Sequence, residues 1–169
     1  MEKTTLQVHG HQGYEERTGA ISQPIYQTAT FRHPGFQQST GYDYSRVLNP
    51  TREELEKTLA LLDGGRRCWA FSSGMAAIGA LLKLFVPGDH VLLSEDLYGG
   101  TARLCNQVYS RYGITFEYVD TAEPELVRQH IRPETRGIFI ETPSNPMMKI
   151  SDIRSLAALA HAQHAILIV

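Results

Sequence analysis

The stretch Ala-Phe-Ser-Ser-Gly-Met-Ala-Ala-Ile, residues 70–78, decides how we expect the chain to fold. An apolar segment at residues 68–71 runs into two serines and Gly74. The apolar side chains that follow recur at helical spacing, at Met75, Ile78, Leu82 and Phe85. This order predicts a strand, a tight turn and a helix. Gly74 would leave the first helical amides open to an anion, although Ser73 is also an ordinary helix cap.

The same alternation continues through the rest of the chain. Further strands are predicted at residues 90–94, 115–119, 137–141 and 165–169. Helices are predicted to begin near Gly74, Gly100, Pro124 and Ser151, the last with an apolar stripe at Ile153, Leu156 and Leu159. Alternating strands and helices are typical of an α/β fold in which a mainly parallel sheet carries helices on both faces. Because the last apolar run has nothing after it, we expect residues 51–169 to be the first half of a longer α/β domain.

Residues 1–50 have a different character. They are polar, rich in Gly, Gln, Thr, Tyr and Pro, and show no sustained period of 3.6 or 2. We therefore expect an extended arm whose backbone groups are satisfied on another surface, such as a neighbouring subunit. The arm's tyrosines favour a docked arm over a disordered one: Tyr14, Tyr26, Tyr42 and Tyr44.

A helix is predicted directly after the arm. Thr51 and Glu54 have the spacing of a capping box, and Pro50 precedes them. Apolar side chains then recur along one face, at Leu55, Leu59 and Leu62, until Gly64 and Gly65 end the helix.

The composition excludes several classes of protein. The 169 residues are 42% hydrophobic and 20% charged with a net charge of −2, which fits a globular protein without a basic nucleic-acid surface. We see no membrane span or signal core and expect a cytoplasmic location. Cys68 and Cys105 are interpreted as buried thiols. We expect no metal, because His9 and His11 lack a third ligand.

Chemically distinctive residues follow the predicted strands, where the loops of a parallel sheet converge at one edge. Tyr98 precedes two glycines and could stack on a flat ligand or pack on its own domain. Glu141 and Asn145 flank a loop stiffened by two prolines, although Asn145 could instead cap its own backbone. Arg46 suits a phosphate and would share a side with Tyr44 if the arm is extended there.

Five motifs occur in the order in which one enzyme family has them: TGAISQPIYQTATF, YDYSRVLNPTREELE, SSGMAA, DLYGGT and ETPSNP. Together they resemble the Cys/Met-metabolism (transsulfuration) family of enzymes that depend on pyridoxal 5′-phosphate (PLP). The resemblance runs from about Thr18 to Val169. It implies the type I fold of PLP-dependent transferases, with the cofactor domain incomplete in this chain.

The resemblance also implies a role for each matched residue. The Ser73-Gly74-Met75 turn would hold the cofactor phosphate, and Tyr98 would stack on the pyridine ring and assist proton transfer. Asn145 would lie by the ring hydroxyl, with Glu141 in the same loop. The remaining pair, Tyr44 and Arg46, would reach the phosphate of the neighbouring subunit, in a homo-oligomer that is a dimer of dimers.

The family's ring-pairing aspartate and Schiff-base lysine have no counterpart in this sequence. We therefore expect an N-terminal portion that is inactive alone. For the full-length enzyme the resemblance implies γ-replacement on an O-acylhomoserine with cysteine, as in cystathionine γ-synthase. Cystathionine or methionine γ-lyase and O-acylhomoserine sulfhydrylase stay open as alternatives, and so does a non-catalytic binding or assembly module.

Overall fold

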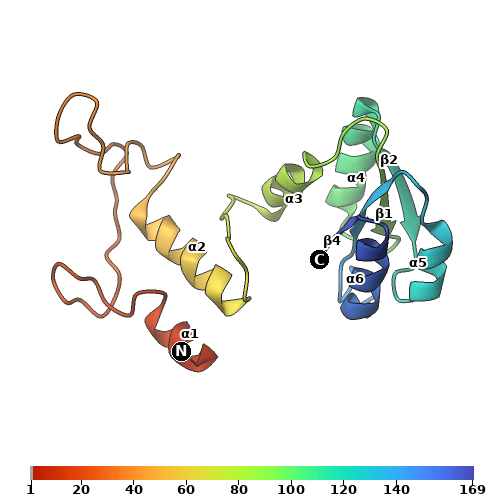
Figure 1. Ribbon diagram of the computed structural model, residues 1–169, viewed down its shortest axis with the longest axis horizontal. Helices are drawn as coiled ribbons and strands as arrows, with labels where there is room; N and C mark the ends of the chain where they lie inside the picture. The colour runs from red at the N-terminus through yellow and green to blue at the C-terminus, as the bar shows by residue number, and fades with distance from the viewer. Residues whose placement is uncertain (1) are drawn as a thin grey trace. The chain divides into compact units, whose positions relative to one another are not determined.

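The computed structural model describes residues 2–169, which divide into two compact units with their boundary between Phe71 and Ser72. The first unit contains α1 (Lys3–His9) and α2 (Pro50–Leu62) (Figure 1). The second contains, in chain order, α3 (Gly74–Leu82), β1 (His90–Ser94), α4 (Gly99–Gln107), a 3₁₀ turn η1 (Tyr109–Tyr112), β2 (Thr115–Val119), α5 (Pro124–His130), β3 (Thr135–Phe139), α6 (Ile153–Ala162) and β4 (Ile166–Ile168).

The second unit is the predicted α/β fold. Its sheet has the order β2-β1-β3-β4, and each neighbouring pair of strands is parallel. A helix joins each strand to the next along the chain, because parallel neighbours need a crossover connection. The mainly parallel sheet expected from the sequence is therefore confirmed.

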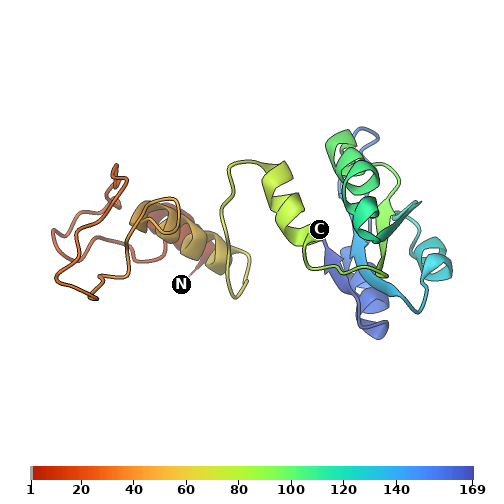
Figure 2. The same ribbon diagram turned by 90° about the horizontal axis from the view of Figure 1, so that it is seen from above.

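A hydrophobic core lies on each face of this sheet. Val91 and Leu93 of β1 pack with residues of α3 and α4 on one face, whereas Leu92 packs with residues of α5 and α6 on the other. Successive strand residues point to opposite faces, so a strand buried on both sides reads as a continuous apolar run. Figure 2 shows α4 on one side of the sheet and α6 on the other.

Gly137 of β3 lies where a larger side chain does not fit. A Cβ at this position would stand 2.4 Å from Cζ of buried Phe85 and 3.4 Å from Val91. Gly137→Ala should therefore lower the free energy of unfolding by about 1–3 kcal/mol, measured by urea denaturation. As a control, Gly79→Ala in α3 meets only Leu104 at 4.0 Å and should leave stability unchanged or slightly raised. Equal effects of the two substitutions would contradict the packing argument.

The strand predicted at residues 68–71 is wrong. This segment is irregular and pairs with no strand in the part of the chain that the structure describes. Its large side chains are not buried, since Trp69 is 65% exposed and Phe71 49%. An apolar run becomes a strand only where a neighbouring strand takes up its backbone groups; here the Ala70 amide donates to the Glu56 side chain instead. The apolar stripe predicted along α6 is only partly buried, since Leu156 is buried while Ile153 is exposed.

The first unit differs from the sequence prediction in two respects. Its chain begins with the short helix α1, although no helical period was expected there. The capping box before α2 is also wrong: Asn49 is the N-cap and its side chain accepts the Thr51 amide hydrogen. The Thr51 hydroxyl and the Glu54 carboxylate instead accept amide hydrogens from the arm, from Tyr26 and His11. The two side chains that were predicted to cap the helix, Thr51 and Glu54, therefore make tertiary contacts with the arm instead.

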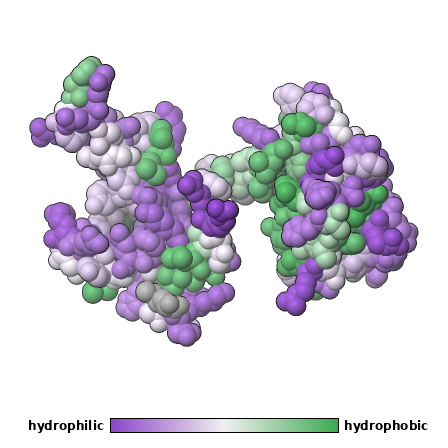
Figure 3. Space-filling view, in the orientation of Figure 1, coloured by the Kyte–Doolittle hydropathy of each residue, from purple (hydrophilic) through white to green (hydrophobic). Residues whose placement is uncertain are grey.

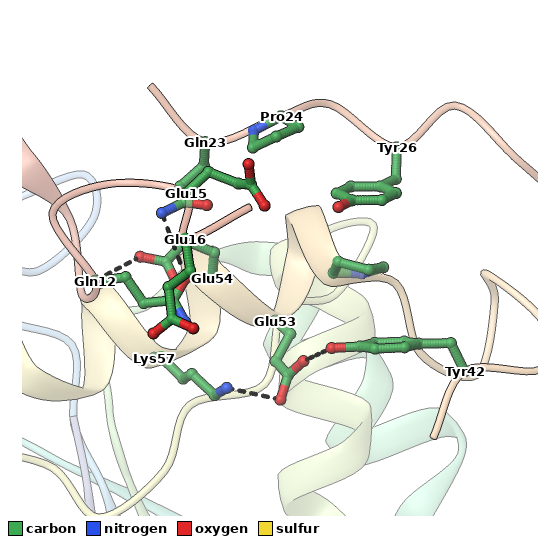
Figure 4. Close-up of a pocket in the computed structure, with 11 residues that line it drawn as sticks. Gln12, Glu15, Glu16, Gln23, Pro24, Tyr26, Tyr42, Glu53, Glu54 and Lys57 are labelled. Atoms are coloured by element: carbon green, nitrogen blue, oxygen red, sulfur yellow. Dashed lines mark hydrogen bonds and ion pairs between the residues drawn. The ribbon is translucent and has the colours of Figure 1, made fainter. Parts of the chain in front are cut away.

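The arm lies against α2 of its own chain. Tyr42 donates its hydroxyl hydrogen to Glu53, which also pairs with Lys57 at 2.9 Å (Figure 4). The hydrogen bond to Glu53 raises the pKa of Tyr42 to about 12. Hydrophilic residues cover most of this unit on the face shown in Figure 3. Polar contacts rather than a hydrophobic core thus hold the arm in place.

Candidate active site

The N-terminal turn of α3 presents free amides. Ser73 has an extended backbone, and its Oγ accepts the Ala76 amide hydrogen at 3.1 Å. The amides of Gly74 and Met75 have no hydrogen-bond partner among residues 2–169. A Cβ built on Gly74 would meet no atom within 4 Å. The turn is therefore open enough, and of the right polarity, to receive an anion.

Tyr98 and this turn meet at Gly100. A Cβ on Gly100 would stand 2.4 Å from Cε1 of Tyr98 and 3.1 Å from Sδ of Met75. The phenol ring therefore lies over the bare backbone of α4, next to the residue that follows Gly74. Tyr98 is 49% exposed, so one part of its ring packs on its own domain and the rest is free to contact a ligand. The structure thus joins two sites that the sequence predicted separately.

Gly100→Ala should push the Tyr98 ring out of this position. If the ring stacks on a cofactor, its displacement should weaken cofactor binding between about two- and ten-fold, which corresponds to ~0.5–1.5 kcal/mol of aromatic stacking. A fluorescence titration with PLP measures this. Gly99→Ala is the matched control, because a Cβ there meets nothing within 4 Å. Equal affinities of the two variants would show that the ring position does not matter.

The loop after β3 contacts the loop after β1. Glu141 Oε2 accepts the Tyr98 amide hydrogen at 2.9 Å, so this carboxylate reaches the backbone of the stacking residue. Asn145 is exposed in the same loop as Glu141. Three of the predicted site residues, Tyr98, Glu141 and Asn145, therefore come from two loops that touch.

A set of polar residues that the sequence analysis did not select ties these loops together. Ser144 Oγ donates to Asp96 at 2.5 Å, and Lys149 Nζ donates to Glu95 at 2.9 Å and to Asp120 at 2.6 Å. The ammonium group beside Asp120 lowers the pKa of that carboxyl, and the two carboxylates raise the pKa of Lys149. Asp96 and Ser144 lie inside the motifs DLYGGT and ETPSNP, but the sequence does not show that they contact each other.

Tyr44 and Arg46 lie together in the first unit. The guanidinium carbon of Arg46 is 4.9 Å from the centroid of the Tyr44 ring, a cation–π contact. The two side chains contact each other although the backbone is not extended from Tyr44 to Arg46, which was the condition of the prediction: Tyr44 forms an isolated bridge with Thr30, and the chain turns immediately after it. The pair presents a cation and a phenol on the arm.

A family model for the Cys/Met metabolism PLP-dependent enzymes matches residues 4–169. The chain belongs to this family of PLP-dependent enzymes. Cystathionine γ-lyase of Bacillus subtilis is 49% identical over 169 residues, all of this chain and 45% of the relative. Cystathionine γ-synthase of Haemophilus influenzae is 47% identical over 156 residues, 92% of this chain and 42% of the relative.

The fold is also that of solved structures from this PLP-dependent family. The crystal structure of cystathionine γ-lyase from Lactobacillus plantarum, complexed with L-serine, matches with a TM-score of 0.91 at 42% identity. The match covers 99% of this chain and 44% of that one. The chain thus spans less than half the length of each of these three relatives.

The residues of this PLP-enzyme chain fit the family's cofactor. Two free amides at a helix N-terminus, at Gly74 and Met75, suit a phosphate, and the half-exposed Tyr98 ring beside them suits a flat pyridine ring. Within residues 2–169, no cluster of His, Cys, Asp and Glu could hold a metal ion. The described part of the chain also has no helix that is long and apolar enough to cross a membrane.

Proposed function

We propose that the full-length protein uses PLP to exchange or eliminate the γ substituent of an amino acid related to cystathionine. One observation carries this proposal: the anion-binding turn of α3 and the Tyr98 ring meet at Gly100, in a chain that matches the family over residues 4–169. The first site offers donors for a phosphate, and the second offers a surface for the ring bonded to it.

In this proposal, the candidate site residues of this chain bind the cofactor or orient it. The amides of Gly74 and Met75 and the hydroxyl of Ser73 would hold the phosphate, while Tyr98 would hold the ring plane. Asn145 would orient the ring hydroxyl, and Glu141 holds the loop of Tyr98. When bound, PLP supplies the electron sink that stabilises charge left on the substrate's α carbon.

Tyr98 has a second function in this proposal. Its ring is half exposed at the carboxyl edge of the sheet, so its Oη can reach a substrate that lies against the cofactor. We assign to Oη the transfer of a proton on the substrate as the γ substituent leaves. Tyr98 is the single proton-transferring residue that we assign in this chain.

The preferred reaction is γ-replacement of an O-acylhomoserine with cysteine, which forms cystathionine. The γ-synthase of Haemophilus influenzae supports it, and the 49% identical γ-lyase supports γ-elimination from cystathionine as the second candidate. Two assays of the full-length protein separate them. Cystathionine formed from O-succinylhomoserine and cysteine supports the first; 2-oxobutanoate formed from cystathionine alone supports the second. Absence of PLP binding would overturn both and leave the binding-module alternative.

The proposal includes a homo-oligomer in the cytoplasm. Tyr44 and Arg46 belong to a unit separate from the residues around Tyr98, and Arg46 is exposed. We propose that this pair completes the phosphate site of a neighbouring subunit, in a dimer or a dimer of dimers. The guanidinium would then face the anion opposite the amides of α3.

A further inference from the structure

Two carboxylates link the loop after β1 to the loop after β3 in opposite directions. Asp96 Oδ2 accepts the Ser144 hydroxyl hydrogen at 2.5 Å and the Met147 amide hydrogen at 2.9 Å. Glu141 Oε2 accepts the Tyr98 amide hydrogen at 2.9 Å. Each loop therefore supplies one carboxylate to the other and receives one from it.

The first of these links is costly to break because Ser144 is buried. Ser144 is 4% exposed, and its Oγ also accepts the Lys149 amide hydrogen at 2.8 Å. The hydroxyl thus donates its one hydrogen to Asp96 and also accepts from Lys149. A buried hydroxyl that loses its partner keeps the full cost of its desolvation, so Asp96 has little freedom to leave.

We propose that Asp96 and Glu141 are positioning residues that form a reciprocal clasp and set the Tyr98 ring relative to Asn145. Asp96 is two residues before Tyr98, and its partner Ser144 is one residue before Asn145. This inference rests on the proposed function, because it takes Tyr98 and Asn145 as cofactor contacts.

The second link holds the residue at which α4 begins. Tyr98 is the N-cap residue of α4, and its side chain makes no capping hydrogen bond. Its own backbone amide is held from outside the helix by Glu141. Because ring position follows from the backbone at that residue, the carboxylate controls where the phenol lies. Small misplacements of a contact group have large effects on catalysis.

A neighbouring ion pair provides a matched comparison. Glu95 adjoins Asp96 in the sequence, but its carboxylate is 50% exposed and is held by Lys149 Nζ at 2.9 Å. Exposed pairs of this kind contribute little to stability. Glu95→Ala therefore removes a carboxylate from the same loop without breaking either link of the clasp.

Hydrogen exchange of individual backbone amides, measured on the full-length protein without cofactor, tests the clasp directly. Glu141→Ala should speed exchange at Tyr98, and Asp96→Ala at Met147, each by about ten-fold or more. If the two links act together, Asp96→Ala should also speed exchange at Tyr98. Should Asp96→Ala fail to fold, Asp96→Asn keeps the shape and one acceptor; because a neutral amide oxygen accepts less strongly than a carboxylate, it should speed exchange at the same amides by a smaller factor. Unchanged exchange at Tyr98 in the folded Asp96 variant would overturn the clasp.

A second measurement tests the effect on the cofactor. Each protein is loaded with PLP, and the visible circular-dichroism band is recorded per bound cofactor, since this band depends on ring orientation. Asp96→Ala and Glu141→Ala should lower it by about half or more, while Glu95→Ala leaves it unchanged. Identical bands in all variants would overturn the positioning role even if exchange confirms the clasp. Wild-type protein that takes up no PLP would overturn the proposed function instead, and the exchange result would still decide whether the clasp exists.

Discussion

A Tyr98→Phe substitution in the full-length protein should lower kcat by about 10²–10⁴ and leave PLP affinity nearly unchanged. The substitution removes the Oη that we assign to proton transfer and keeps the ring that lies over Gly100. The substitution should therefore lower turnover without lowering the affinity for PLP. Steady-state kinetics together with a PLP titration measure the two quantities on the same preparation.

The control for this prediction is another exposed tyrosine of the same unit. Tyr112 is 65% exposed and lies in η1, outside the loops of the candidate site. Tyr112→Phe should change neither kcat nor cofactor affinity. Equal losses of turnover and of PLP affinity in Tyr98→Phe would refute the proton-transfer role, because the hydroxyl would then serve binding alone.

An Arg46→Ala substitution should raise the dissociation constant of PLP by about 10- to 150-fold. A hydrogen bond from a charged group is worth ~1.5–3 kcal/mol, and this change is its equivalent in affinity. Equilibrium dialysis against PLP measures it. Arg17→Ala is the control in the same arm, since the Arg17 side chain is 78% exposed and lies 4.0 Å from Glu15. Equal PLP affinities of the two variants would show that Arg46 does not contribute to the phosphate site.

Mixed oligomers test whether Arg46 acts on a neighbouring subunit. Arg46→Ala and Tyr98→Phe subunits are each defective, but a hybrid dimer would contain one site with both residues intact. Random exchange makes about half of the dimers hybrid, so mixing should restore about a quarter of wild-type activity at limiting PLP. No recovery after demonstrated exchange would place Arg46 in its own subunit's site.

The sequence predicted the second unit more accurately than the first. The strands near residues 90 and 115 and the helix starts at Gly74 and Pro124 agree with the structure, because hydrophobic periodicity reports burial on a regular element. The predicted strand at residues 68–71 and the capping box at Thr51 were wrong. Both depend on partners distant in the sequence: a neighbouring strand in one case, and the arm residues Tyr26 and His11 in the other.

By itself the sequence determined the α/β order, the open turn at Gly74 and the motifs that indicate a PLP enzyme, since each is a local pattern of residue types. Only the tertiary structure decided that Tyr98 lies over Gly100 and that Asp96 binds Ser144. The physical reason is separation along the chain. Asp96 and Ser144 are 48 residues apart and meet because parallel strands bring their carboxyl ends to one edge of the sheet, a contact that no periodicity in the sequence records.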